Sequence, residues 1–489
     1  MTEQCERKHE VTMKNTPLRL VPILTLAMAG CAVGPNYKRP TTTTPEHYKA
    51  EAFGLWKEGH PVDSTPKGDW WHIFGDGTLN DLQSRALGAN QDLKAAMARV
   101  EQARATARVV GSELLPTINA DPSSTRQRFS ANQVPSFGVV TVNNYRAPLD
   151  LSYEIDLWGR VRRGFEGARA DAQASVAAFH NVLLVLNAEV AQNYFALRAL
   201  DAEISIVART LELRKNQVLL VKDRFKRGIG NDLDVARAET ELATTEAEAA
   251  SLAKRRAELE NTLAILVGEN PSAYNFPVAS SNGGKIWNPS PPKIPAGLPA
   301  DLLERRPDVG EAERQLAAAN ARIGVAKAAF FPVLSLTASG GYVSGDIDTL
   351  FNWPSHVWSI GPSLSLPIFA GGRNLAHYNR SKAAFEEATA RYRQSILVAF
   401  GDVENSLAGI RFLTDEAAAQ DRAVANSRRA AELAGERYRS GIASYFEVID
   451  ADSAALQAER AKAQLAGELL IASVHLIKAL GGGWRAQGD

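Results

Sequence analysis

Cys31 is the residue of this sequence whose type and surroundings most clearly predict a chemical modification. It is one of only two cysteines among 489 residues, and the small residues Ala29 and Gly30 precede it. Before them lie basic residues and a short apolar run, residues 20–29, as in a secretory signal peptide. We expect residues 1–30 to be removed and the Cys31 thiol to be acylated, which would anchor the chain to a membrane. An ordinary signal peptide followed by an incidental cysteine is the alternative.

No other part of the sequence has a pattern typical of catalysis or metal binding. The eight histidines never fall at ligand spacing, and two cysteines are too few for a disulfide framework or a cysteine metal site. Phosphate-binding loops, zinc-protease motifs and nucleophile elbows are absent. Lys plus Arg equals Asp plus Glu at 55 each, so no strong field attracts nucleic acid. We therefore expect no enzyme activity, no cofactor, no metal and no nucleic-acid partner.

The chain contains two internal repeats. Residues 225–235 resemble residues 438–448, at an offset of 213 residues. The same offset holds for the matching positions from 160 to 268, so no net insertion separates the halves there. A constant offset predicts paired elements whose lengths match, because loops alone would drift in length.

Long helices are the elements that the repeats predict. The segments 149–270 and 368–489 contain no proline and are rich in Ala, Glu, Arg and Leu. Apolar residues recur every seven positions from Val190 to Phe225, and three of five intermediate positions are apolar, Arg214 being an exception. This spacing is typical of a coiled-coil seam. An unbroken helix over residues 160–228 would be roughly 100 Å long. Beyond the signal peptide, no apolar run approaches the roughly 20 residues of a membrane helix.

Glycines predict where each long helix turns back. Gly228 and Gly441 occupy equivalent positions in the two repeats, and glycine ends a helix at low cost by taking the left-handed conformation. Asn231 or Asp232 can cap the returning helix of the first repeat. Each half should therefore contain a long antiparallel helical hairpin.

Ahead of each helical hairpin the apolar pattern has period two. Apolar and polar residues alternate at 149–157 and 359–369, and upstream strands are expected at 116–130 and 332–343, although Pro122 weakens the first. Each chain would then supply four strands as two separate hairpins. A soluble β-sandwich alternates in the same way, but we favour a transmembrane barrel closed by several chains. Two chains would give eight strands and three would give twelve.

These patterns divide the chain into six expected segments. The segments are a signal peptide (1–30), a lipidated extended linker (31–69), a first repeat (70–270), a Pro-rich linker (271–299), a second repeat (300–481) and a C-terminal tail (482–489). Each repeat should consist of a helix, a β-hairpin and a helical hairpin. The hairpins are expected at about 116–158 and 160–268 in the first repeat, and at about 332–369 and 373–481 in the second.

Three motifs resemble the TolC-type outer-membrane efflux proteins, specifically their OprM- and NodT-like lipoprotein branch. The motifs are Cys31–Pro40 (CAVGPNYKRP), Trp70-Trp71 with Phe74 and Asp76, and Leu298–Asp308 (LPADLLERRPD). The resemblance covers nearly all of the chain after the signal peptide. Ala32 agrees with it, because Asp in that place is the typical signal for retention in the inner membrane.

The resemblance implies a mainly α-helical protein with a β-barrel part. A homotrimer would close a twelve-stranded barrel in outer-membrane lipid, and an α-helical tunnel would extend into the periplasm. A periplasmic adaptor, also called a membrane fusion protein, would link it to an inner-membrane efflux pump. The implied function is a passive exit duct for drugs or other small toxic compounds. An exit duct for protein secretion is the alternative, and a coiled-coil envelope lipoprotein without a pore is a more distant one.

The resemblance also implies roles for residues at the two hairpin turns. The expected adaptor contacts are Gly228, Ile229, Leu233, Gly441, Ile442 and Phe446. The expected periplasmic aperture residues are Asp234, Tyr438, Glu447 and Asp450. The glycines also fit simple helix caps, and the two acids of the second turn also fit a helix N-terminus. Ala443 stands where one branch of the family has an arginine, so an ionic latch at that position is not expected.

Overall fold

The computed structural model describes residues 32–41, 69–132, 140–278, 289–292, 294 and 306–482. The expected signal peptide, Cys31 and most of both linkers lie outside the described residues. The chain divides into two compact units. The sheet unit contains Met1–Tyr37, Thr106–Arg169 and Ala318–Phe385, and the helical unit contains Lys38–Ala105, Ala170–Ala317 and Glu386–Asp489.

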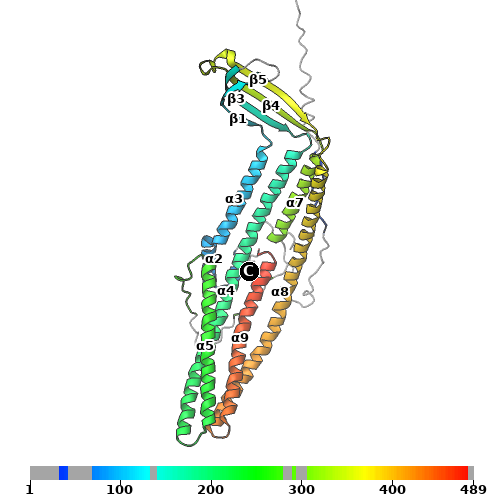
Figure 1. Cartoon of the computed structure of the whole chain (residues 1–489). Coiled ribbons are helices and arrows are strands. Elements are labelled where there is room, and N and C mark those ends of the chain that lie inside the picture. The colour runs from blue at the N-terminus through cyan, green and yellow to red at the C-terminus, as the bar shows by residue number, and fades with distance from the viewer. Residues whose placement is uncertain are drawn as a thin grey trace, which may run out of the picture. The chain divides into compact units, whose positions relative to one another are not determined.

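The sheet unit holds one antiparallel sheet with the strand order β1-β3-β4-β5, and β2 also pairs with β3 (Figure 1). The strands are β1 (Thr117–Ala120), β2 (Ser123–Phe129), β3 (Val140–Ile155), β4 (Val333–Ser344) and β5 (His356–Ser365). The sheet has four strand positions across it, as expected, but five strands, because the first expected strand is divided into β1 and β2. Its register continues across the break, since Ala120 pairs with Leu149 and Ser123 pairs with Arg146. Pro122 lies in the break and has no backbone N–H to donate to the ladder.

The two faces of the sheet differ sharply in polarity over most of its length. One rung of the apolar face is Ile118, Leu151, Ala338 and Ile360, and the adjacent rung on the other face is Thr117, Ser152, Thr337 and Gly361. The period of two seen in the sequence is therefore confirmed. Ile360 is 65% exposed and Leu364 is 67% exposed. An exposed apolar face of this extent suits contact with lipid.

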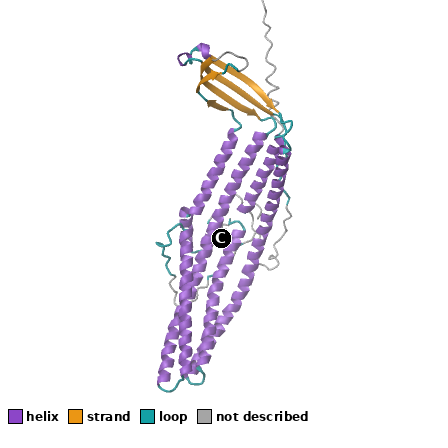
Figure 2. Cartoon of the chain, in the orientation of Figure 1, coloured by secondary structure: helices purple, strands orange, loops and turns teal. Residues whose placement is uncertain are grey.

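Six of the described α-helices, drawn in purple in Figure 2, form three pairs of equal length. The 67-residue pair is α4 (Arg160–Lys226) and α8 (Arg373–Arg439), the 35-residue pair is α5 (Asp232–Leu266) and α9 (Tyr445–Ala479), and the 22-residue pair is α3 (Gln91–Ser112) and α7 (Pro307–Ala328). The two longer pairs keep the offset of 213 residues that the sequence predicted. Short elements precede α3, namely the 3-10 helix η2 (Trp70–Phe74) and α2 (Gly77–Ala89). Two further 3-10 helices, η4 (Ile347–Thr349) and η5 (Trp353–Ser355), lie between β4 and β5.

The main apolar cluster of the helical unit explains one of the sequence motifs. Trp70 and Trp71 are buried in this cluster, which also contains residues of α2, α4, α5 and α9. The Asp76 carboxylate caps α2 by accepting hydrogen bonds from its first N–H groups. It also accepts from the Tyr194 hydroxyl of α4 at 2.5 Å. Burial and this hydrogen bond raise the pKa of Tyr194 to about 12, so the hydroxyl remains a donor.

One helix departs from the expectation that no segment after the signal peptide resembles a membrane span. α4 contains a window with a mean hydropathy of 1.4, so by length and composition alone this helix could cross a membrane. However, 39% of that window is buried within the chain. Several apolar residues of α4, such as Leu186, Val190 and Leu197, lie in the main apolar cluster. Packing within the helical unit therefore accounts for part of its apolar character.

Candidate functional site at the hairpin turns

Both helical hairpins turn through the same backbone motif. Gly228 has a φ of 76° and Gly441 a φ of 75°, as expected for left-handed helix ends. The Ile229 N–H donates to the Arg224 carbonyl at 3.0 Å, and the Ile442 N–H donates to the Arg437 carbonyl at 2.9 Å. These bonds, with the bond that each glycine N–H donates to the carbonyl three residues earlier, form a Schellman motif. The prediction that glycines end the two long helices is confirmed.

The returning helices begin with different caps. In the first repeat Asn231 is the cap, and its side chain accepts a hydrogen bond from the Asp234 N–H at 2.8 Å. This settles the choice between Asn231 and Asp232, since Asp232 is the first residue of α5. In the second repeat the Glu447 carboxylate accepts from the Ser444 N–H at 3.3 Å, so Glu447 supports the start of α9.

The residues expected to contact an adaptor lie at the surface of the two turns. Ile442 is 71% exposed and Phe446 is 55% exposed, and Ile229 and Leu233 are also exposed. A Cβ added to Gly228 or Gly441 would meet no atom within 4 Å. Figure 1 shows the α4–α5 and α8–α9 turns at the same end of the helical unit. Ile229, Leu233, Ile442 and Phe446 are therefore exposed apolar residues of the two turns at this end of the helical unit.

A small apolar cluster holds the two turns together. It contains Val218 and Val221 of α4, Ala238 of α5, and Tyr445 and Val448 of α9, with Tyr438 of α8 packed against it. The Tyr438 and Tyr445 rings lie 5.5 Å apart. Burial raises the pKa of Tyr445 to about 12. The cluster therefore joins the first helical hairpin to the second near the turns.

The structure separates the expected aperture residues into two kinds. Tyr438 packs between the hairpins, and Asp234 is half-buried in the first turn of α5. Glu447 and Asp450 are exposed and lie three residues apart in α9, where side chains share one helical face. Arg437 Nη2 lies 3.8 Å from Glu447 Oε2. Among the residues described, no group of three His, Cys, Asp or Glu side chains could hold a metal ion within one chain.

Three arginines of the first hairpin contribute to this site, and the sequence interpretation missed their role. The Arg224 guanidinium carbon lies 4.6 Å from the Tyr438 ring centre, and that of Arg237 lies 5.4 Å from the Phe446 ring centre. Arg214 is 1% exposed and donates to Ser453 Oγ at 3.0 Å. Only Arg214 has a signal in the sequence, as the charged residue in an otherwise largely apolar seam.

Two adjacent charged residues of α9, Glu459 and Arg460, tie this helix to the other three long helices. Their partners are Arg209 and Glu203 of α4, Glu248 of α5 and Arg428 of α8. Arg460 Nη2 donates to Glu203 Oε1 at 2.5 Å, and Glu203 is 1% exposed. A buried carboxylate needs such a partner, because an unpaired buried charge is strongly destabilising.

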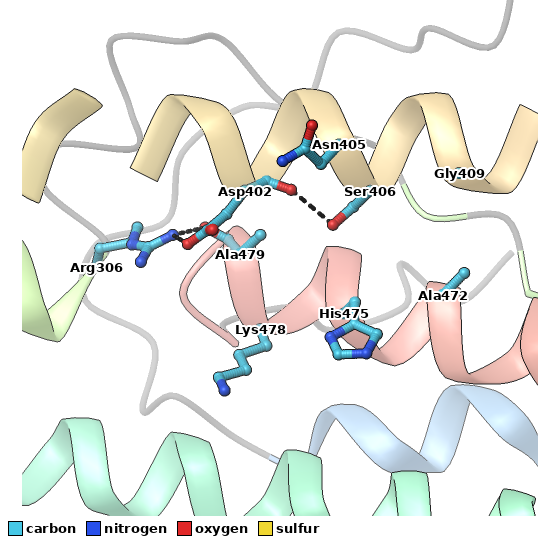
Figure 3. Close-up of a pocket in the computed structure, with 9 residues that line it drawn as sticks. All are labelled: Arg306, Asp402, Asn405, Ser406, Gly409, Ala472, His475, Lys478 and Ala479. Atoms are coloured by element: carbon cyan, nitrogen blue, oxygen red, sulfur yellow. Dashed lines mark hydrogen bonds and ion pairs between the residues drawn. The ribbon is translucent and has the colours of Figure 1, made fainter. Parts of the chain in front are cut away.

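The arginine of the Leu298–Asp308 motif lines a cavity of about 360 Å³ in the helical unit (Figure 3). Arg306 Nη2 lies 2.6 Å from Asp308, and its Nη1 lies 2.9 Å from Asp402 of α8. Nη1 also donates to the Ala479 carbonyl at the end of α9, at 3.3 Å. Cations near the C-terminus of a helix are favourable. Arg306 therefore fastens the start of α7 to α8 and α9.

The segment that follows Cys31 is docked within the sheet unit. The Val33 N–H donates to the Trp158 carbonyl at 2.9 Å. Arg163 Nη2 donates to Asn36 Oδ1 at 2.6 Å, and the Asn320 side chain donates to the Pro35 carbonyl at 3.0 Å. Residues 33–36 of the Cys31–Pro40 motif therefore bind near the start of α4 and to Asn320 within α7, and Cys31 itself lies outside the described residues.

Comparisons with known proteins agree with this architecture. The sequence profile of the family described as "Outer membrane efflux protein" matches residues 82–269 and 298–482. The cation efflux system protein CusC of Escherichia coli is 31% identical over 470 residues, covering 96% of this chain and 100% of CusC. The solvent efflux pump outer membrane protein SrpC of Pseudomonas putida is 34% identical over 464 residues, covering 94% of this chain and 97% of SrpC. The CmeC outer membrane channel of Campylobacter jejuni has a TM-score of 0.87 and 28% identity, covering 94% of this chain and 96% of CmeC.

The chain therefore belongs to the outer membrane efflux protein family. It is an outer-membrane channel component of an efflux system, as the resemblance implied, with a helical part that extends into the periplasm. Proteins of this family are channels and not enzymes.

Proposed function

We propose that three copies of this chain form a passive exit duct for drugs or other small toxic compounds. An inner-membrane pump supplies the energy, and a periplasmic adaptor connects the pump to the duct. The observation that carries the proposal is the sheet. Its apolar face is exposed, and its outer strands, β1 with β2 on one side and β5 on the other, pair with no further strand in the part of the chain that the structure describes.

Closing this sheet requires more than one copy of the chain. Lipid offers no hydrogen bonds to the edge of a sheet, so a sheet that spans the membrane must close into a barrel. β1 and β2 share one register and count as one strand across the sheet, so each chain supplies four. Two copies would give eight strands and three would give twelve, both within the range of known barrels. The resemblance to the TolC-type proteins favours three.

The cargo is proposed as a class of compounds. The names of two similar relatives refer to cations and to solvents, and these relatives have similar identities to this chain, 31% and 34%. Such similar identities favour neither cargo. A passive duct also adds little selection, because the pump chooses what enters. We therefore propose small toxic compounds in general.

The hairpin turns are proposed as the adaptor contact and the aperture. Exposed Ile229, Leu233, Ile442 and Phe446, together with Gly228 and Gly441, would meet the adaptor. In a trimer, Glu447 and Asp450 would each present three carboxylates around the axis, which favours cations. Asp234 and Tyr438 would help to set the width of this entrance. Glu447 would then both stabilise the start of α9 and contribute to the ring of carboxylates around the axis.

Lipidation of Cys31 is proposed to aid assembly. Replacing Cys31 by Ala is expected to lower the amount of assembled trimer several-fold without abolishing transport by the trimers that form. The sheet still offers its apolar face to lipid, and the docking contacts of residues 33–36 do not involve the thiol. Lipidation is measured by incorporation of radiolabelled palmitate, assembly by the yield of trimer, and transport by dye efflux per trimer. Loss of all transport at a normal trimer level would contradict this role.

The duct itself is tested with protein purified from the outer membrane. Cross-linking should give three copies, and the same preparation should conduct ions across a planar lipid bilayer. An assembly that never conducts would favour a coiled-coil envelope lipoprotein without a pore. A conducting dimer would contradict the proposed stoichiometry.

A further inference from the structure

The two hairpin turns of one chain are joined by aromatic rings that lie under arginines. Arg224, near the end of α4, lies over the ring of Tyr438, near the end of α8. Arg237 of α5 lies over the ring of Phe446 of α9. In both cases the cation belongs to the first hairpin and the ring to the second. Any motion that separates the two turns must therefore break both contacts.

Arg224 supplies a cation at Tyr438, in a turn where the sequence predicts no ionic latch at position 443. Ala443 removes the arginine that one branch of the family has in this turn. Here Arg224 places a guanidinium 4.6 Å from the Tyr438 ring centre, within the distance at which a cation and a ring attract each other. The Tyr438 ring in turn contacts Tyr445, which is buried in the cluster between the hairpins. The contact is thus anchored in the packed part of the turns.

Phe446 takes part both in the contact with Arg237 and in the proposed binding of the adaptor. The Arg224–Tyr438 and Arg237–Phe446 contacts are called the latch below. Phe446 is 55% exposed and is one of the residues proposed to contact the adaptor. A partner that covers Phe446 would compete with Arg237 for the same ring. A ligand shifts a two-state equilibrium by its different affinity for the two states. If the adaptor competes with Arg237 for the Phe446 ring, it binds more tightly to the state in which the Arg237–Phe446 contact is broken.

We propose that Arg224 and Arg237 hold the two turns together through the rings of Tyr438 and Phe446, and that the adaptor releases them by taking Phe446. The inference rests on the proposed function, since it assumes that the turns form the entrance of the duct. Arg224 is a positioning residue in this account: it acts on the entrance through Tyr438.

The test is the conductance of purified full-length trimers in planar bilayers, without adaptor. Arg224→Gln should raise the fraction of time spent in the open state about two- to fivefold, the factor typical of one partly exposed cation–π contact. Tyr438→Leu should do the same, and the double variant should add little to either. Tyr438→Phe keeps the ring and loses only the hydroxyl, so it should raise the open fraction less than Tyr438→Leu does.

Arg227→Gln is the matched control. Arg227 lies in the same turn, is 68% exposed through its side chain and pairs with Asp223, so its loss removes an arginine without removing a ring contact. An equal effect of Arg227→Gln and Arg224→Gln would overturn the proposal in favour of a general charge effect. A Tyr438→Phe variant that opened as often as Tyr438→Leu would overturn it in favour of a hydroxyl hydrogen bond.

Competition by the adaptor is tested separately. Phe446→Leu removes the ring that Arg237 contacts, so the channel without adaptor should open more often, and added adaptor should raise the open fraction by a smaller factor than in wild type. If Phe446→Leu left the open fraction unchanged, the second contact would be wrong. If wild-type trimers failed to conduct at all, the proposed duct would fail and not this latch.

Discussion

Valine in place of Gly228 or Gly441 is expected to abolish most efflux while the trimer still assembles. Both glycines have φ near 75°, where a β-branched residue is strained by about 1–2 kcal/mol. A Cβ at either position meets no atom within 4 Å, so the new side chain would point outward at the turn. Strain and bulk then fall on the surface proposed for the adaptor. Each loss of about 1.4 kcal/mol in docking would weaken binding roughly tenfold.

Gly75→Val is the matched control for this prediction. Gly75 has a φ of 64° and equally open surroundings, but it follows η2 and lies outside both turns. Dye accumulation in cells, the amount of SDS-resistant trimer, and co-purification of the adaptor measure the outcome. Normal transport by both turn variants would show that the turns are not the docking surface.

Alanine in place of Arg460 is expected to produce the largest loss of stability among the substitutions considered. Arg460 is the α9 partner of Glu203, which is 1% exposed, and it also binds Glu248. Removing one member of a buried ion pair leaves the other charge unpaired, which costs about 3–5 kcal/mol. The trimer should therefore lose its helical signal at a clearly lower temperature, and less of it should accumulate.

Arg429→Ala is the control for the Arg460 prediction. Arg429 pairs with Glu432 three residues away on α8, and both side chains are well exposed, so this pair contributes at most about 1 kcal/mol. The double variant Glu203→Gln with Arg460→Met should recover much of the loss, because it removes both charges. If Arg460→Ala unfolded at the wild-type temperature, Glu203 would not depend on this partner.

The parts of the fold that depend on local pattern could be predicted from the sequence. The constant offset between repeats predicted helices of equal length, and glycine at equivalent positions predicted where they end. Alternation predicted the two faces of the sheet. Pro122 was recognised as a weak point, but its result, a strand divided between β1 and β2 in one register, depends on the pairing with β3.

Contacts between the repeats could not be predicted in the same way. Arg224 and Tyr438 are far apart in sequence, and each lies in a segment where a charged or aromatic residue is unremarkable by itself. Only the packing of α4 against α8 and α9 brings them together. Glu447 is a different case, because Ser444 followed three residues later by Glu is a local capping pattern. That pattern could have indicated its hydrogen bond before the structure did.

We propose that this channel exports small molecules. This proposal is tested most directly by the accumulation of a fluorescent dye and several antibiotics in a host that lacks this protein and its paralogues. Accumulation is compared with and without the gene, expressed together with its pump and adaptor. Accumulation should be lower when the gene is restored. Unchanged accumulation, with the trimer present in the outer membrane, would contradict small-molecule efflux and favour protein secretion.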